Sequence, residues 1–392
     1  MEMRPGYKQT DVGVIPEDWD VKYVGDLFEI TSSKRVFQSE WKTHGIPFYR
    51  ARELAVLGES GEVDNDLFIS REMYERFKGR HGVPAPGDML VTGVGTLGKT
   101  YVVADNREFY FKDGNIIWFK IGATISSEFL RQLYLTPVVI KQIGDGSAGT
   151  TVGTYTITGA KKTIIPVPPP PEQRAIAMAL SDVDALLNSL ERLIAKKRDL
   201  KQAAMQQLLT GQTRLPGFHE AWQVKRLGNI APLQRGFDLP NPQLRNGPYP
   251  VVYSNGVLNY HAKYQVHGPG VVTGRSGTIG RVTFVEGAYW PHNTTLWVTS
   301  FRNNDPRFVY YLYTQVGFER FASGSGVPTL NRNDAHGYAV EIPSTKAEQT
   351  AIASVLSDMD AELSALETRR NKTRDIKQAM MQELLTGRIR LV

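Results

Sequence analysis

Residues 93–100 read GVGTLGKT, a spacing of glycines and lysine that can hold a phosphate group. In such a loop, backbone amides surround the anion, Lys99 would reach the outer phosphates, and a helix starts after the last glycine. Here the next residues are YVVADN, whose β-branched side chains predict a strand ending in a turn. The related segment GRSGTIGRV at residues 274–282 has Arg281 and Val282 in place of the Lys-Thr pair. We therefore expect a strand–turn–strand hairpin with a basic residue at its exit in both segments, and keep a nucleotide-binding enzyme as an alternative.

The other side chains that could do chemistry form no catalytic or metal-binding pattern. The chain has no cysteine, which excludes disulfides, cysteine nucleophiles and thiolate metal sites. Its histidines show no metal-ligand spacing, and we find no Asn/Asp-Pro-Pro-Tyr segment, no Ser-His-Asp set and no paired carboxylates that stand out. We expect no catalytic residue, no metal and no cofactor on this chain.

Basic residues in expected loops, beside aromatic and amide side chains, favour nucleic-acid binding. Arginine suits bidentate contact with guanine, asparagine and glutamine suit adenine, and lysine suits phosphate. The candidates are Lys34, Arg35, Arg52, Arg76, Lys78 and Lys99 in the first half of the chain, and Arg235, Arg245, Arg275, Arg281 and Arg332 in the second half. Any one of them, taken alone, is better explained as a solvated surface side chain.

A long internal repeat indicates how these loops are held. Residues 172–215 align without gaps on residues 348–391, and about 27 of the 44 positions are identical. Weaker echoes precede each copy: WDVKYVG and WQVKRLG open two β-rich stretches, and each stretch closes on an Ile-Pro pair. The sequence thus predicts four parts: a first globular domain at 1–168, a first helix at 169–211, a second globular domain at 212–343 and a second helix at 344–392.

Both copies of the repeat predict a long helix with a narrow apolar stripe. Four prolines lead into the first copy, Glu172 stands in its first turn, and Gly211 follows its end. Apolar residues recur in steps of four and three and then shift phase to Leu200 and Ile376, a coiled-coil seam with a stutter. The expected pairing residues are Ile176, Leu180, Val183, Leu187, Leu190, Ile352, Leu356, Met359, Leu363 and Leu366.

The connectivity makes the two helices each other's expected partner. The second globular domain starts where the first helix ends, and the second helix starts where that domain ends, so a compact domain sets the helices antiparallel. The fold class expected is α+β, with two β-rich domains joined by an intramolecular coiled coil in a pseudo-two-fold repeat. The chain start resembles the joint after the first helix, which favours a closed arrangement. An intermolecular coiled coil is the alternative, and self-association of the isolated chain stays open.

Composition and charge set the remaining bounds. The 392 residues fit two or three domains, and 41% hydrophobic residues are typical of a folded protein. No stretch is apolar enough for a membrane helix, so we expect a cytoplasmic protein without membrane contact. The net charge of +6 is uneven, because residues 1–165 carry about −1 and residues 216–342 about +4.

The most distinctive parts of the repeat are IPVPPPPEQRAIAMALSDVD and EIPSTKAEQTAIASVLSDMD, with the endings QLLTG and ELLTG, and IPEDW near the start. In these segments and in their order the chain resembles the specificity subunit of type I restriction-modification enzymes. The resemblance implies two target recognition domains, each reading one half of a split double-stranded DNA sequence, with the helices as spacer. It also implies docking of two methyltransferase subunits and of motor-nuclease subunits, which would hold AdoMet, ATP and magnesium.

A second class of protein stays open from the residues alone. Tyrosine and asparagine also suit a multi-domain coiled-coil scaffold that binds protein or carbohydrate. That interpretation predicts no salt-dependent DNA binding, whereas the nucleotide-binding enzyme predicts ATP binding that is lost in Lys99→Ala.

Overall fold

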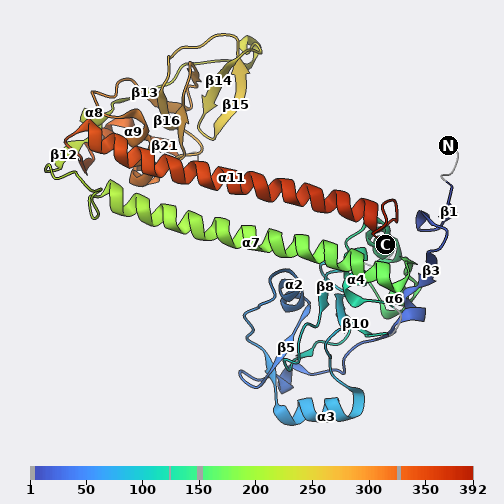
Figure 1. Ribbon diagram of the computed structural model, residues 1–392. Helices are drawn as coiled ribbons and strands as arrows, with labels where there is room; N and C mark the ends of the chain where they lie inside the picture. Colours follow the sequence, from blue (N-terminus) through green and yellow to red (C-terminus); the bar gives the residue numbers. More distant parts are fainter. Residues whose placement is uncertain (1–4, 123–124, 148–152, 325–327, 392) are drawn as a thin grey trace. The chain divides into compact units, whose positions relative to one another are not determined.

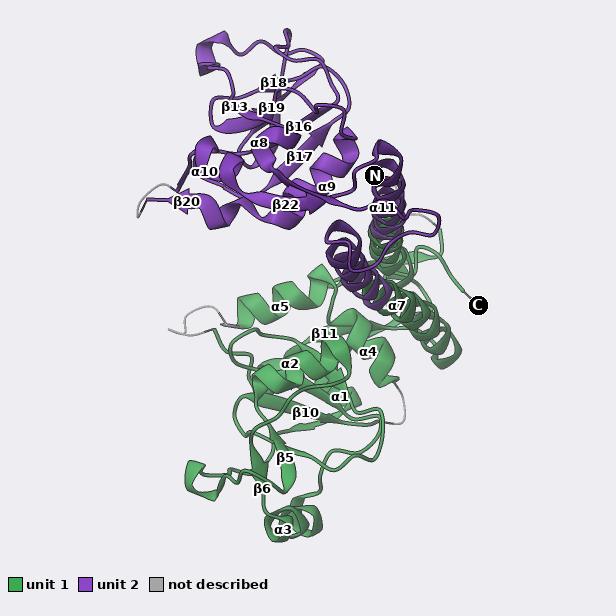
Figure 2. Cartoon of the chain, turned by 90° about the vertical axis from the view of Figure 1, so that its left-hand side faces the viewer, with its two compact units in different colours: residues 1–191, 369–392 green, residues 192–368 purple. Residues whose placement is uncertain are grey.

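The computed structural model describes residues 5–122, 125–147, 153–324 and 328–391. The chain divides into two compact units (Figure 2): unit 1 is residues 1–191 and 369–392, and unit 2 is residues 192–368. The two long helices are α7 (Pro170–Leu209) and α11 (Lys346–Leu384) (Figure 1), and each contributes a part to both units. The expected α+β class, with two β-rich parts joined by two long helices, is confirmed. No helix in the described ranges is both long and apolar enough to cross a membrane.

A four-stranded antiparallel sheet forms the centre of unit 1. Its strands, in order across the sheet, are β4 (Glu29–Thr31), β10 (Ile116–Lys120), β7 (Met89–Thr92) and β8 (Thr100–Val102). Successive side chains point to opposite faces, so Met89 and Val91 pack with α7 and α4 (Ser127–Leu133), and Leu90 packs with α2 (Ala51–Ser60). Because both faces are covered, the central strands β7 and β10 are buried over nearly their whole length.

The remaining elements of unit 1 surround this sheet. A three-stranded sheet has the order β6 (Phe68–Ile69), β5 (Ile46–Tyr49) and β9 (Tyr110–Phe111), with β5 and β9 parallel. Two strand pairs are β1 (Tyr7–Thr10) with β2 (Gly13–Pro16) and β3 (Asp20–Tyr23) with β11 (Ile164–Val167). The further helices are α1 (Val24–Leu27), η1 (Gln38–Glu40), α3 (Arg71–His81), α5 (Pro137–Ser147) and α6 (Ile157–Lys162).

Unit 2 repeats the topology of unit 1. Its four-stranded sheet has the order β13 (Leu233–Arg235), β19 (Thr295–Val298), β16 (Gly270–Gly274) and β17 (Val282–Val285). Its three-stranded sheet has the order β15 (Gly256–His261), β14 (Tyr249–Tyr253) and β18 (Trp290–Pro291), again with a parallel pair, β14 and β18. The units differ after the first parallel strand, because α2 follows β5 whereas β14 turns directly into the hairpin strand β15.

The other elements of unit 2 complete the correspondence. Two strand pairs are β12 (Gln223–Arg226) with β22 (Ala339–Ile342) and β20 (Ala322–Ser323) with β21 (Thr329–Leu330). The further helices are α8 (Leu227–Ile230), η2 (Asn241–Gln243), α9 (Pro306–Val316), η3 (Phe318–Phe321) and α10 (Arg332–Gly337). The pair β12–β22 stands where β3–β11 stands in unit 1, each opening and closing a globular part.

Both glycine-rich segments are hairpin loops, as expected. The first joins β7 to β8 and the second joins β16 to β17, and both strand pairs are antiparallel. The last glycines, Gly98 and Gly280, have φ of 75° and 96°, which lets the chain reverse. Lys99 is followed by a strand and not by a helix, so the phosphate-binding interpretation of GVGTLGKT lacks the helix N-terminus that it needs.

Candidate nucleic-acid interface and helix pair

Three connections of unit 1 meet at one end of its four-stranded sheet, which we call loop end 1. They are the segment after β4 (residues 32–37), the β7–β8 loop (residues 93–99) and the β9–β10 loop (residues 112–115). The amide of Gly93 donates to the carbonyl of Asn115 over 2.8 Å. The hydroxyl of Ser32 donates to the carbonyl of Ile116 over 2.7 Å. Loop end 1 is therefore a connected surface and not a set of separate loops.

Lys34 and Arg35 are exposed on loop end 1, in the segment after β4. The amide of Lys34 donates to the hydroxyl of Tyr110 over 2.8 Å, which fixes the path of this segment. The guanidinium of Arg35 donates to Asp113 of the β9–β10 loop over 3.0 Å. An ion pair thus links two of the three connections.

Arg52 lies on α2, and Lys99 lies on the side of loop end 1 that faces α2. Arg52 is exposed in the first turn of α2. The ammonium of Lys99 donates to Glu59 near the end of α2 over 2.6 Å. Lys99 also lines a hollow of about 570 Å³ that reaches Asp184 and Lys377 on the long helices. The structure therefore places Lys99 between the loops and the helix pair.

Arg76 and Lys78 lie on α3, which borders the segment after β4. Phe77 between them stacks on Tyr110 with ring centroids 4.9 Å apart. Both cations are exposed, and the Lys78 ammonium is 3.9 Å from Glu108. The structure brings this helix beside loop end 1, although neither cation is on the three connections that form it.

The matching end of the unit 2 sheet is built in the same way, and we call it loop end 2. Its connections are the segment after β13 (residues 236–238), the β16–β17 loop (residues 275–281) and the β18–β19 loop (residues 292–294). The amide of Arg275 donates to the carbonyl of Thr294 over 2.8 Å, and the amide of Gly236 donates to the carbonyl of Thr295 over 3.0 Å. Four of the five unit 2 candidates lie on or beside this end: Arg235, Arg275, Arg281 and Arg332.

Arg275 and Arg281 form no ion pair with any residue that the structure describes. Arg275 is half-buried between the β18–β19 loop and residue 330, and its carbonyl accepts a hydrogen bond from Leu330 over 2.8 Å. The guanidinium of Arg281 lies against Gly256 at the β14–β15 turn, where a Cβ would come within 2.9 Å of it. Gly256 has a φ of +108°, so the turn both requires glycine and leaves room for the arginine.

A hollow of about 670 Å³ opens on loop end 2, lined by Gln234, Arg235, Gly236, Phe237, Asp238 and Arg332. Arg235 donates to Asp238 over 2.8 Å, and Asn293 donates to the same carboxylate. The hydrogen bond from Asn293, followed by that from Arg235, lowers the pKa of Asp238. Arg332, the first residue of α10, is exposed and has no carboxylate partner among the described residues.

Arg245 is the one unit 2 candidate that does not lie on or beside loop end 2. Its amide is 3.0 Å from Nδ1 of His261, the last residue of β15. His261 pairs with Tyr249 at the end of the hairpin away from the β14–β15 turn. Arg245 therefore does not join the other cations at loop end 2.

Two polar groups at loop end 2 were not identified from the sequence. The ring of His292 packs at a tilt of 36° against Tyr253 with ring centroids 4.3 Å apart, and its Nδ1 is 3.0 Å from the hydroxyl of Thr294. Burial lowers the pKa of His292, which favours its neutral imidazole. Asn293 is the second group. The sequence did carry a signal for both residues, which is their position in the repeat. The segment HNT (residues 292–294) directly precedes β19, just as DGN (residues 113–115) directly precedes β10.

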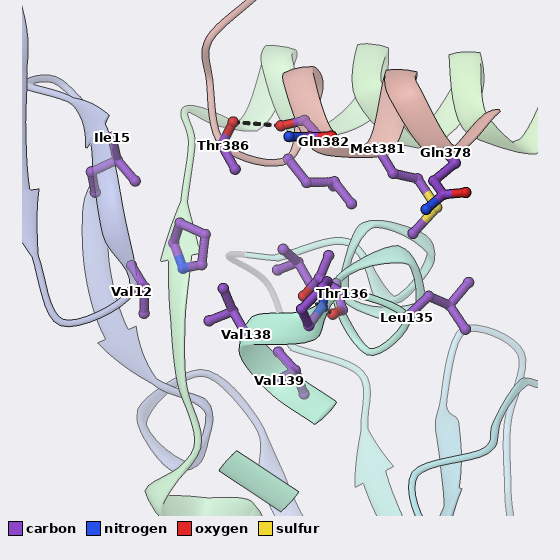
Figure 3. Close-up of a pocket in the computed structure, with 14 residues that line it drawn as sticks. Val12, Ile15, Leu135, Thr136, Val138, Val139, Gln378, Met381, Gln382 and Thr386 are labelled. Atoms are coloured by element: carbon purple, nitrogen blue, oxygen red, sulfur yellow. Dashed lines mark hydrogen bonds between the residues drawn. The ribbon is translucent and has the colours of Figure 1, made fainter. Parts of the chain in front are cut away.

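A mainly apolar hollow of unit 1 lies apart from these cations. It has a volume of about 540 Å³ and lies where the β1–β2 hairpin, the start of α5 and the last turns of α11 meet (Figure 3). Val12, Val139 and Met381 line it, and the polar groups at its wall are the amides of Gln378 and Gln382 and two threonine hydroxyls. None of its lining residues is a lysine, an arginine or a histidine, so it does not suit a polyanion. In the described part of the chain, no group of three or more His, Cys, Asp or Glu could hold a metal ion.

The helix pair is antiparallel and repeats its ion pairs in the two units. In unit 1, Lys377 contacts Asp184 at 2.6 Å and Arg374 contacts Glu191 at 3.1 Å. In unit 2, the residues offset by 176 form the same pairs: Lys201 with Asp360 and Arg198 with Glu367. Residue numbers that rise on α7 fall on α11, so the antiparallel, intramolecular pairing and the pseudo-two-fold repeat are confirmed.

The expectation of a stutter in the apolar seam is wrong. Leu200 and Ile376 are each 47% exposed, whereas Lys201 is half-buried. The steps of four and three continue without a phase shift through Lys197 and Lys201 on α7. These lysines take seam positions because their stems pack along the interface while their ammonium groups bind Glu362 and Asp360.

The expected pairing residues have two roles. Ile176 and Leu180 are fully buried in the core of unit 1 together with Phe129 of α4, and Ile352 and Leu356 are buried in the core of unit 2. The seam between the helices is formed by the remaining expected residues, which are buried or half-buried: Val183, Leu187, Leu190, Met359, Leu363 and Leu366. The start of each helix thus anchors a globular part before the helices pair.

A buried carboxylate marks the start of each long helix. Trp19 donates to Glu172 over 3.0 Å, and the same carboxylate accepts from Arg390. The equivalent set in unit 2 is Trp222, Glu348 and Arg214, with Trp222 donating over 3.2 Å. The closed arrangement expected from the chain start is therefore present in unit 1. There the segment after α11 contacts the start of α7 through Arg390, whereas in unit 2 the equivalent contact is made by Arg214 in the covalent joint after α7.

Comparison with known proteins agrees with the division of the chain into two repeats. Residues 16–201 and 219–373 match the family described as type I restriction modification DNA specificity domain, one match in each repeat. The chain belongs to this family. As a type I specificity subunit it is a recognition subunit and not a catalytic one. The two matches leave only the joint between the repeats and the two ends of the chain uncovered.

Similar specificity subunits are found in bacteria and archaea. A putative type I restriction enzyme specificity subunit of Haemophilus influenzae is 31% identical over 169 residues, which are 43% of this chain and 40% of that protein. The putative MjaX specificity subunit of Methanocaldococcus jannaschii is 22% identical over 98% of this chain and 97% of its own length. The crystal structure of a type I S subunit from M. genitalium shares the fold, with a TM-score of 0.67, 17% identity and coverage of 97% and 99%.

Proposed function

We propose that this specificity subunit reads a bipartite double-stranded DNA sequence, with loop end 1 reading one half and loop end 2 the other. The observation that carries the proposal is the repetition of one loop end on two sheets of the same strand order, with different side chains on each. The segment after β4 carries Lys34 and Arg35, whereas the segment after β13 carries Phe237 and Asp238. Two different readers recognise an asymmetric site.

The side chains at the loop ends suit reading in the major groove. Arginine can contact guanine in a bidentate manner, and an amide such as Asn293 can contact adenine. Lysines and further arginines contact phosphate groups, which supplies affinity and fixes register. A neutral His292 is able both to donate and to accept a hydrogen bond.

The helix pair is proposed to set the spacing of the two half-sites and to dock two methyltransferase subunits. Leu200 on α7 and Ile376 on α11 are equivalent by the repeat, and each is 47% exposed beside the seam. An apolar side chain that flanks a coiled-coil seam widens the face on which a further helix can pack. Two equivalent faces suit two copies of one partner. Motor-nuclease subunits would complete the enzyme, and AdoMet, ATP and magnesium would be held by the partners.

The test is to co-express the chain with its methyltransferase subunit and to map the methylated positions on DNA. A modified sequence made of two short specified parts separated by an unspecified gap is the expected result. Exchange of residues 233–298, which span loop end 2, for those of another specificity subunit should change only one part. A continuous site, or methylation that does not depend on this chain, would contradict the proposal. The alternative of a scaffold for protein or carbohydrate predicts no salt-dependent DNA binding at all.

A further inference from the structure

We infer that unit 2 supplies most of the salt-sensitive DNA affinity, through phosphate contacts of Arg275, Arg281 and Arg332, whereas Arg35 and Lys99 of unit 1 are neutralised by carboxylates of the same unit. The inference rests on the proposed function, because it requires that both loop ends face DNA. It adds that the two globular parts, although they have the same topology, contribute unequally to the salt-sensitive DNA affinity.

The ion pairs of the two globular parts differ in number. Among the described residues before residue 166, nine lysines and arginines form ion pairs: Lys22, Arg35, Arg50, Arg71, Lys78, Lys99, Arg107, Lys120 and Arg131. In the described residues between 216 and 342 only Arg235 and Arg307 do so. Residues 1–165 contain 20 Lys and Arg against 21 Asp and Glu, and residues 216–342 contain 11 against 7.

The contrast is clear at the loop ends themselves. On loop end 1, Arg35 is held by Asp113 at 3.0 Å and Lys99 by Glu59 at 2.6 Å, and Lys34 forms no ion pair with a described residue. On loop end 2, Arg235 is held by Asp238 at 2.8 Å, but Arg275 and Arg281 have no carboxylate partner among the described residues. The exposed guanidinium of Arg281 lies against Gly256.

The physical consequence follows from counterion release. A cation that neutralises a phosphate displaces condensed counterions from DNA, and each such contact adds about 0.9 to the slope of log affinity against log salt. A cation that is already paired must first leave its carboxylate, which then lies unpaired beside the phosphates. Paired cations therefore add less to affinity, and their contribution changes less with salt.

The experiment measures binding of the chain, in complex with its methyltransferase subunits, to a labelled random-sequence duplex of about 30 base pairs. Affinity is followed over about 50 to 200 mM potassium chloride. The triple variant Arg275→Gln, Arg281→Gln, Arg332→Gln should lose about 2 to 3 units of slope. The matched triple variant of unit 1, Lys34→Gln, Arg35→Gln, Lys99→Gln, should lose less than about 1 unit.

A change in the opposite direction tests the neutralisation in unit 1. Asp113→Asn releases Arg35 and should steepen the slope by up to about 1 unit, with tighter binding at low salt. Asp20→Asn makes the same charge change by releasing Lys22 on β3, away from loop end 1, and serves as the control. Its slope should stay at the wild-type value.

The outcomes separate this inference from the proposed function. Wild-type complex that shows no salt-dependent binding would overturn the proposed function itself. Wild-type complex that binds, with equal losses of slope in the two triple variants or a larger loss in that of unit 1, would overturn only the inference that the two globular parts contribute unequally. An unfolded triple variant is recognised by its circular dichroism, and the single substitutions of the same residues then carry the comparison.

Discussion

Arg390 donates two hydrogen bonds to Glu172, which lies 218 positions earlier in the chain, over 2.5 and 2.7 Å. The Glu172 side chain is fully buried, and the guanidinium extends beyond it to Asp18. In this way the segment after α11 is fastened to the start of α7. The same relationship joins Arg214 to Glu348 in unit 2, where the chain runs on covalently through the joint.

We expect Arg390→Ala to destabilise unit 1 by about 3 kcal/mol, because removal of one partner leaves a buried carboxylate without its counter-charge. Unfolding by urea, followed by the fluorescence of Trp19 and the other tryptophans, measures the loss. Arg388→Ala is the control, since Arg388 and Glu383 form an exposed pair at 3.6 Å, and it should cost less than about 1 kcal/mol. Equal stabilities of the two variants would show that the Arg390 contact does not hold unit 1 together.

The stability of the helix pair should fall in acid because of Asp184. Burial by itself raises the pKa of this carboxyl, but hydrogen bonds from Lys377 and Gln132 and the charge of Arg131 outweigh burial and lower the pKa below its ordinary value. A carboxyl with a depressed folded-state pKa stabilises the fold above its unfolded-state pKa, and that contribution is lost as pH falls through the folded-state value. We expect the loss to begin below about pH 4. Asp184→Asn should show a smaller decline over that range in urea unfolding, and a parallel decline would argue against this assignment.

Carboxylates placed in the seam should separate the long helices. Leu363 is 9% exposed and Leu187 is half-buried, so Leu187→Asp with Leu363→Asp buries two unpaired charges at a cost of several kcal/mol. We expect loss of helical circular dichroism and no co-purification with the methyltransferase subunits. Ala195→Asp, at an exposed position of α7, is the control and should retain both. Retained co-purification of the double variant would show that the pair is not needed for assembly.

The exposed apolar side chains beside the seam should serve docking and not folding. We expect Leu200→Lys with Ile376→Lys to change the unfolding free energy by less than about 1 kcal/mol, because both side chains are already half in water. The same variant should weaken binding of the methyltransferase subunits at least tenfold, as measured by titration of the isolated chain. Ala195→Lys adds a charge on another side of α7 and should bind normally. Unchanged affinity of the double variant would place the docking surface elsewhere.

The sequence by itself determined the architecture, because the repeat at an offset of 176 and the steps of four and three are local patterns that survive in one dimension. It also predicted loops for Lys34, Arg35, Arg275 and Arg281, which lie in the connections of the two loop ends, whereas Arg235, expected in a loop, is the last residue of β13. It misplaced Leu200, since counting apolar residues cannot recognise a lysine such as Lys201 as a seam residue when an aspartate on another helix balances it.

Tertiary structure alone decided which cations are free and which carboxylates are buried. Asp113 and Arg35 are 78 positions apart and meet only because β9 and β4 end at the same edge of the folded unit. Arg390 reaches Glu172 only when the last segment returns to the first unit. Electrostatic pairing depends on distance in space, and no periodicity in the chain reports it.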